Sequence, residues 1–182
     1  MDVEKKIPKI IHQTWKDSNL PEHWKDTHST WKTTHPDYEY KLWTDSDNRY
    51  LIASMYPWFL KIFDNYPYGI QRADVVRYFI LYTYGGIYVD LDIQATKNIQ
   101  KIIDEYGRDK EVVLVPTKNN LTMNILTNAI MISCKKAKFW KSVFRRLLKQ
   151  PDPKWYHLGK HLQVMNTTGP VMISEVYGKY PF

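Results

Sequence analysis

Two carboxylates, Asp90 and Asp92, are the residues whose type and spacing best fit metal chemistry in this chain. Side chains alternate between the two faces of a strand, so residues one position apart are expected to point the same way. Carboxylate oxygens are the ligands that hard divalent cations such as Mg²⁺ and Mn²⁺ prefer. An isolated Asp-x-Asp is common by chance, so the flanking elements must decide whether the pair is a metal site or only the end of a strand.

The preceding segment has the pattern of a helix, a break and a buried strand. A helix is predicted over 70–84, Gly85-Gly86 ends it, and the apolar residues 87–89 lead as a strand into Asp90.

On the predicted helix, Gln71, Asp74 and Arg77 recur every three residues and form one polar stripe. Ala73, Val76 and Ile80 form the opposite, buried face. A surface ion pair of little energetic value is the ordinary interpretation of Asp74 and Arg77. Their position directly before the acidic pair favours a binding role.

Strands alternate with helices along the rest of the chain, which predicts an α/β fold with a largely parallel sheet. Further strands are expected at 9–13, 38–43, 111–116 and 128–133, and further helices at 21–34, 45–55, 98–106 and 137–149. Residues 151–168 give no clear pattern.

These features together resemble the DXD-containing sugar transferases. The family includes fungal initiating α-1,6-mannosyltransferases, inositol-phosphoceramide mannosyltransferases and α-1,4-galactosyl- and N-acetylglucosaminyltransferases, and the glucosylating bacterial toxins are distant relatives. The resemblance covers about residues 7–133. It rests on Gln71, Arg72, Asp74, Arg77, Tyr78, Leu81, Tyr82, Gly85, Gly86, Tyr88, Asp90 and Asp92, with support from Ile7–Trp15 and His35–Trp43.

The resemblance implies a GT-A-type, Rossmann-like nucleotide-diphospho-sugar transferase domain with a Mn²⁺ or Mg²⁺ cofactor. It implies a UDP-sugar or GDP-mannose donor, a glycan or glycolipid hydroxyl as acceptor, and retention of anomeric configuration. By the same resemblance Asp92 contacts the cation directly. Asp90 contacts the ribose or sugar and reaches the metal through water. Both carboxylates are the predicted catalytic residues.

The predicted donor-binding residues are Trp15, Gln71, Asp74, Arg77 and Asn128. Trp15 corresponds to the aromatic residue that stacks on the nucleobase in the toxin relatives, and a place in the core is its alternative. Asn128 opens a strand and either faces the site or packs.

Other polar residues are open to two interpretations. Tyr88 shares the strand face of Asp90 and either borders the site or packs in the core. His12 is interpreted as a structural histidine. His157 and His161 stand four residues apart and could face one metal on a helix, although no glutamate of the metalloprotease pattern accompanies them.

Composition limits the class of protein. The chain has 182 residues, 43% of them hydrophobic, so it is expected to form one globular catalytic domain over 1–182. The expected location is cytoplasmic, because no apolar run reaches the ~20 residues of a membrane span and no signal peptide is evident. Membrane or Golgi association is the alternative if the sequence is a fragment.

The net charge of +7 favours anionic partners. The basic segment 135–149 is predicted to be the solvated face of a helix, with a membrane-surface contact as the alternative. Nucleic acid is not an expected partner.

Two rival functions remain open at this level. One is a metal-dependent phosphoryl-transfer nuclease that uses the acidic pair. The other is a non-catalytic domain that binds sugar nucleotides, which the shortness of the chain favours. Relatives continue to a tryptophan-flanked motif, containing histidine or serine, that completes the metal site. Residues 169–182 show no counterpart, so a C-terminally truncated domain is an alternative to a complete one.

Overall fold

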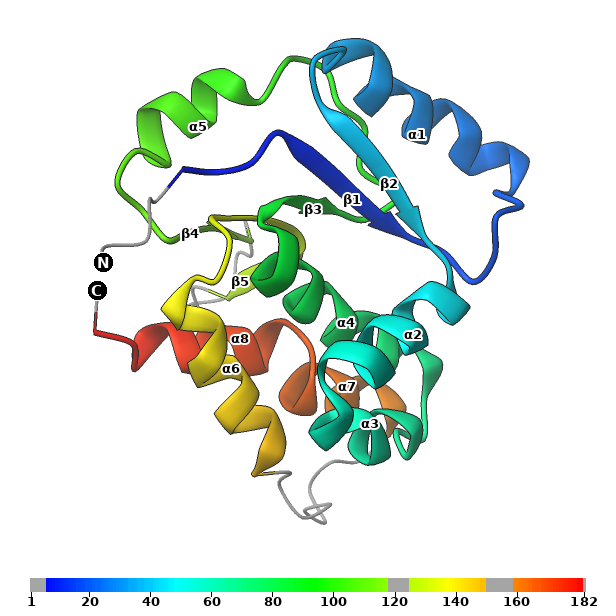
Figure 1. Cartoon of the computed structure of the whole chain (residues 1–182), viewed down its shortest axis with the longest axis vertical. Helices are drawn as coiled ribbons and strands as arrows, with labels where there is room; N and C mark the ends of the chain where they lie inside the picture. Colours follow the sequence, from blue (N-terminus) through cyan, green and yellow to red (C-terminus); the bar gives the residue numbers. More distant parts are fainter. Residues whose placement is uncertain (1–5, 118–124, 150–158, 182) are drawn as a thin grey trace.

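A five-stranded sheet lies at the centre of the molecule, with helices against both of its faces (Figure 1). This computed structural model describes residues 6–117, 125–149 and 159–181. The strands are β1 (Ile10–Thr14), β2 (Glu39–Trp43), β3 (Gly86–Val89), β4 (Val112–Pro116) and β5 (Leu126–Ser133), in the order β2-β1-β3-β5-β4.

Four of these strands run in one direction and β5 runs in the other. β1 pairs in parallel with β2 and with β3, whereas β5 pairs antiparallel with β3 and with β4. The prediction of a largely parallel sheet is therefore correct for the first three strands and wrong at β5.

The helices match the predicted periodic segments. They are α1 (Glu22–Thr34), α2 (Asp45–Met55), α3 (Pro57–Asp64), α4 (Gly69–Tyr84), α5 (Gln100–Tyr106), α6 (Lys138–Leu148), α7 (Lys160–Thr167) and α8 (Pro170–Gly178). α3 and the last two helices were not predicted. No helix among the described residues is long and apolar enough to cross a membrane.

Two apolar cores fill the space on either side of the sheet. The larger lies among α2, α3, α4, α6 and α8, and the smaller beneath α1 and α5. Strand alternation assigns Tyr88 to the first core, and Ile87 and Val89 to the second. All three are fully buried, so both cores pack against β3, one on each face.

The glycine pair between α4 and β3 is required by both conformation and space. Gly85 has φ +67° and Gly86 φ +94°, a region that favours glycine. A Cβ at Gly86 would lie 2.4 Å from the carbonyl oxygen of Ile10. The chain can therefore turn from helix into central strand only with glycine at this point.

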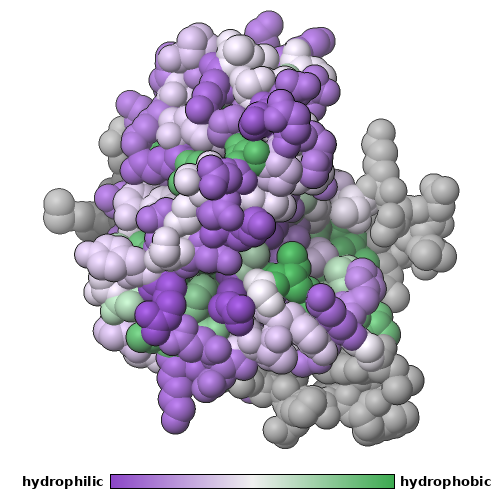
Figure 2. All heavy atoms as spheres, turned by 90° about the vertical axis from the view of Figure 1, so that its right-hand side faces the viewer, coloured by the Kyte–Doolittle hydropathy of each residue, from purple (hydrophilic) through white to green (hydrophobic). Residues whose placement is uncertain are grey.

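One face of the molecule, on the side of α1, α2 and α3, is mostly hydrophilic, and the hydrophobic side chains that reach the surface gather mainly in its lower half (Figure 2). The exposed large hydrophobic residues of α2 and α3 are Tyr50, Met55 and Trp58. The inner faces of the same helices bury Leu51, Ile52, Phe59 and Phe63 in the larger core and so anchor them.

Candidate active site

The acidic pair lies in a tight turn and not on a strand. β3 ends at Val89, and the Ile93 amide donates to the Asp90 carbonyl at 3.2 Å to close a turn over Asp90–Ile93. The prediction that the acidic pair lies on an extended strand was therefore wrong, because β3 ends at Val89. The Asp90 amide still donates to the Ala129 carbonyl at 2.8 Å, which ties the start of the turn to β5.

The Asp90 carboxylate is held by two buried groups. The Tyr88 hydroxyl donates to it at 2.8 Å, and Nη1 of Arg77 lies 3.2 Å away. The Arg77 guanidinium also stacks 4.6 Å from the centre of the Tyr88 ring. Of the two interpretations of Tyr88, core packing holds for its ring, which is buried in the larger core, while its hydroxyl contacts Asp90.

Arg77 connects Asp90 to a buried polar network in the interior. Its Nη1 donates to the Asn128 carbonyl at 2.8 Å, and Nη2 lies 3.4 Å from Asp74. Asn128 donates from Nδ2 to Asp74 at 2.9 Å, and Thr168 donates its hydroxyl to the other Asp74 oxygen at 3.1 Å. The structure therefore brings four predicted residues into direct contact.

The ion pair of Asp74 and Arg77 is buried. Their side chains are 6% and 4% exposed, so the surface interpretation is wrong. Burial raises the pKa of Asp74, while Arg77, Asn128 and Thr168 oppose that rise. Burial disfavours the charge of Arg77, but Tyr88, Asp90 and Asp74 together raise its pKa. Arg77 is therefore a fixed positive charge behind Asp90.

Gln71, the third residue of the stripe, is also buried, and its Nε2 donates to the Thr167 hydroxyl of α7 at 2.9 Å. The stripe thus faces the α7–α8 connection and β5. α4 is therefore buried on its polar stripe as well as on the predicted apolar face. Thr168 is a site residue that sequence reasoning missed. Its contact with Asp74 joins residues 94 positions apart, and only the Thr-Gly-Pro turn at 168–170 marked the segment.

Trp15 follows the end of β1, at the sheet edge where Asp90 lies. Thr14 connects the two places, because its hydroxyl is 2.9 Å from that of Tyr88. Trp15 is partly exposed, yet its indole nitrogen is buried without a partner among the described residues, and Oδ1 of Asn48 is in the same state. An unsatisfied buried polar atom costs roughly 1–3 kcal/mol, so each of these two atoms is a candidate to bind a ligand. Asn48 was also missed by sequence reasoning.

The two carboxylates can supply part of the shell of a hard cation. Asp92 is exposed, and Asp90 retains 31% side-chain exposure despite its two contacts. The described residues contain no cluster of three or more histidine, cysteine, aspartate or glutamate side chains that could hold a metal. His161 is exposed at the start of α7, and His157 lies outside the described residues. Oxygen ligands from a bound nucleotide would have to join Asp90 and Asp92.

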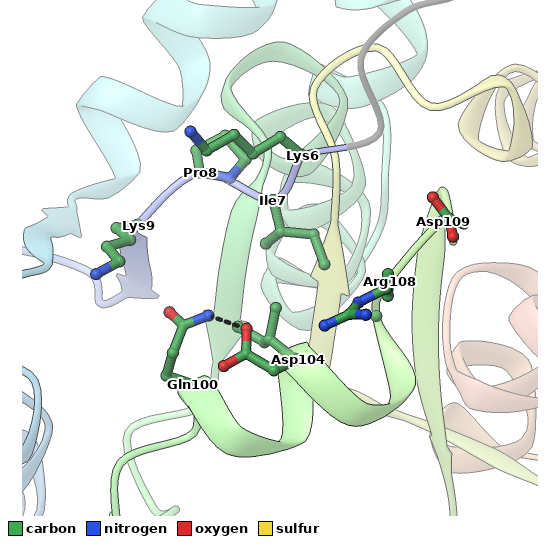
Figure 3. Close-up of a pocket in the computed structure, with 10 residues that line it drawn as sticks. Lys6, Ile7, Pro8, Lys9, Gln100, Asp104, Arg108 and Asp109 are labelled. Atoms are coloured by element: carbon green, nitrogen blue, oxygen red, sulfur yellow. Dashed lines mark hydrogen bonds between the residues drawn. The ribbon is translucent and has the colours of Figure 1, made fainter.

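A hollow of about 590 Å³ lies at the other edge of the sheet and is not this site. Its wall includes Lys6, Lys9, Gln100, Asp104 and Arg108, with Arg108 and Asp104 facing one another across it (Figure 3). These residues precede β1 or belong to α5 and its end. Ligands of open α/β sheets bind outside the carboxyl ends of the strands, where Trp15 and Asp90 lie.

Comparison with known proteins gives the family of the central region. Residues 21–109 match the family described as "Glycosyltransferase sugar-binding region containing DXD motif". The chain is 40% identical to inositol phosphoceramide mannosyltransferase 2 of Schizosaccharomyces pombe, over 96% of this chain and 47% of that protein. It is 37% identical to mannosyl phosphorylinositol ceramide synthase SUR1 of Saccharomyces cerevisiae, over 96% and 42%. The chain thus spans about half the length of these relatives.

Solved structures agree on the fold. The PaToxG glycosyltransferase superimposes with a TM-score of 0.63 at 16% identity, over 96% of this chain and 70% of that one. The catalytic domain of the α-toxin of Clostridium novyi gives 0.52 at 11% identity, over 96% and 64%. The fold is therefore that of the GT-A glycosyltransferases, as predicted. Within it, the region from 21 to 109 is the part that matches the DXD-containing sugar transferase family.

Proposed function

We propose that this chain carries the donor site of a metal-dependent glycosyltransferase that moves a hexose from a nucleotide-diphospho-sugar to a glycan or glycolipid hydroxyl. The observation that carries the proposal is the Asp90–Ile93 turn at the carboxyl edge of the sheet, joined through Arg77 to Asp74 and Asn128. Likeness to the mannosyltransferases favours mannose as the sugar and an inositol phosphoceramide as the acceptor.

The arrangement suggests a division of roles. Trp15 and Asn48 offer a donor and an acceptor to the nucleotide, and Asp92 offers an exposed carboxylate. Arg77 and Tyr88 hold Asp90 where it can contact the ribose or sugar. When bound at Asp92 and Asp90, Mn²⁺ or Mg²⁺ neutralises charge on the departing diphosphate.

The proposed reaction retains the anomeric configuration. The acceptor oxygen forms its bond to the anomeric carbon on the face from which the diphosphate leaves. The bond between that carbon and the phosphate oxygen breaks, and the released phosphate takes the acceptor proton. No side chain is assigned as a base, in keeping with the resemblance to retaining enzymes.

Asp92→Asn tests the metal role, because it removes charge with little change of shape. We expect Mn²⁺-dependent binding of GDP and UDP, followed by calorimetry, to be lost. Turnover of the sugar nucleotide should fall by about 100-fold, the loss of roughly 3 kcal/mol of transition-state stabilisation. Asp109→Asn is the matched control, since Asp109 is also an exposed aspartate and lies at the opposite edge of the sheet.

Unaltered metal dependence in Asp92→Asn would disprove the metal assignment. Sugar-nucleotide binding by the wild type without any turnover would favour the rival binding domain over the enzyme.

We also propose that α6 meets an anionic membrane surface, where a glycolipid acceptor would lie. All of its apolar residues except Leu148 at its end are buried in the larger core, namely Phe139, Trp140, Val143, Phe144 and Leu147. Six cations remain exposed in and beside the helix, at Lys135, Lys136, Lys138, Lys141, Arg145 and Lys149. The contact would therefore be electrostatic, without insertion of the helix.

A further inference from the structure

The segment that follows the acidic turn has no regular structure, yet several of its polar groups are paired with α1 and its end. Residues 94–99 belong to neither helix nor strand. The Ala95 amide donates to the Thr30 hydroxyl at 3.0 Å, and the Ile99 amide to Nε2 of His35 at 2.9 Å. Asn98 donates to the Thr34 carbonyl at 2.9 Å. Irregular backbone keeps one conformation only when outside groups fix it, and here α1 and its end supply them.

The acidic turn itself is held at both of its ends. The Asp90 carbonyl accepts from Nε2 of Gln13 at 3.3 Å. The Ile93 carbonyl accepts from Nε1 of Trp31, on α1, at 2.7 Å. Gln13 and Trp31 are 0% and 3% exposed, so both bonds are shielded from water. Asp92 lies between these two fixed points.

The Gln13 side chain is oriented in turn by Tyr40 of β2, which itself contacts His28 of α1. The Tyr40 hydroxyl donates to Oε1 of Gln13 at 2.6 Å and lies 2.6 Å from Nδ1 of His28. With the His28 proton on Nδ1, each group donates to the next: His28 to Tyr40, Tyr40 to Gln13, and Gln13 to Asp90. The direction of the Gln13 amide is thereby set.

We propose that Trp31 and Gln13 are positioning residues that fix the Asp90–Ile93 turn for metal binding, with α1 as their support. This inference rests on the proposed function. Groups that orient metal ligands contribute strongly to metal affinity, and their loss commonly costs 10–100-fold. The bond of Trp31 to the Ile93 carbonyl, one residue after Asp92, is the most direct of these contacts.

Trp31→Phe tests the proposal, because it removes the indole N–H and retains an aromatic ring in the smaller core. Mn²⁺ is titrated into the protein with GDP, and separately with UDP, and bound Mn²⁺ is followed by electron paramagnetic resonance. We expect the Kd for Mn²⁺ to rise about tenfold. Binding of the nucleotide in EDTA should change less than twofold. Trp24→Phe is the matched control, since Trp24 lies on α1 with no hydrogen bond from its indole to the described residues.

Gln13→Met gives an independent second variant, which removes the donor to the Asp90 carbonyl at similar side-chain length. A fall in melting temperature without a change in Mn²⁺ affinity, in either folded variant, would overturn the proposal and leave α1 as core packing. Wild-type protein that binds neither nucleotide with Mn²⁺ would overturn the proposed function, and this inference with it.

Discussion

At the scale of single residues, His12 is a buried neutral imidazole that ties three elements together. Its Nδ1 accepts from the Trp43 indole at 3.1 Å, so its Nε2 carries the proton and donates to the Gly85 carbonyl at 2.9 Å. Burial lowers the pKa of His12 to about 4. The interpretation of His12 as structural fits these contacts, because it connects β1 to β2 and to the end of α4.

This pKa predicts a specific loss of stability in acid. Between the unfolded value of about 6.5 and the folded value of about 4, only the unfolded chain takes up the proton, so folding weakens as the pH falls. The loss should reach about 2 kcal/mol at pH 5 and about 3.4 kcal/mol below pH 4. Nothing is lost above about pH 7.

His12→Gln removes the titration and keeps an acceptor for Trp43 and a donor for Gly85. Urea unfolding at pH 7.5 and pH 5 should show a drop about 2 kcal/mol smaller in the variant than in the wild type. Equal drops in both proteins would show that the proton uptake comes from other groups.

At the scale of elements, periodic patterns and the glycine and proline residues that interrupt them located most of the helices and strands. The helix predicted over 70–84 is α4 at Gly69–Tyr84, because the required glycine at 85 marks its end. The direction of β5 in the sheet could not be predicted, because the apolar pattern of a strand is the same for parallel and antiparallel pairing. α3 was missed, and so were α7, which lies within the segment 151–168 that gave no clear pattern, and α8, which follows it.

The site was predictable only as far as local spacing reaches. Asp74 and Arg77 share one helix, and Asp90 follows the next strand, so their proximity was apparent from the sequence. The turn geometry of Asp92 and the contact of Thr168 with Asp74 depend on long-range packing. The hydrogen bond from Trp31 of α1 to the Ile93 carbonyl could not be predicted for the same reason, because the sequence around Trp31 indicates only an ordinary buried residue.

The exposed face of α6 gives a prediction that belongs to a whole element. The double variant Lys141→Glu/Arg145→Glu should lower affinity for vesicles containing phosphatidylserine by at least about tenfold at low salt, because each cation near an anionic surface contributes about 1 kcal/mol. Sedimentation with the vesicles measures the bound fraction, which should fall as salt rises.

Lys101→Glu/Lys110→Glu is the matched control for the α6 variant. It changes the net charge equally, through two exposed lysines at and beyond α5. Equal losses in both double variants would assign the binding to total charge and remove the special role of α6.

At the scale of the whole molecule, the two cores meet on β3, and the acidic turn emerges where that strand ends. α4 supplies Arg77 from the side of the larger core, and α1 supplies Trp31 from the side of the smaller one. The turn is therefore held from both faces of the sheet. Ligand binding at this point should stabilise the molecule as a unit, because both cores contribute to the site.

The last prediction concerns cooperation between cation and nucleotide. Among the described residues only Asp90 and Asp92 offer carboxylates at the turn, while Mn²⁺ generally takes about six oxygen positions. Mn²⁺ alone should therefore shift the melting temperature by less than about 1 °C. Mn²⁺ with the preferred nucleoside diphosphate, at about 100 times its Kd, should stabilise by roughly 2.7 kcal/mol, or about 5–10 °C. Differential scanning fluorimetry with UDP, GDP and their sugars identifies that nucleotide. A full shift with Mn²⁺ alone would mean that further protein ligands complete the cation shell, and His161 would be the first residue to substitute.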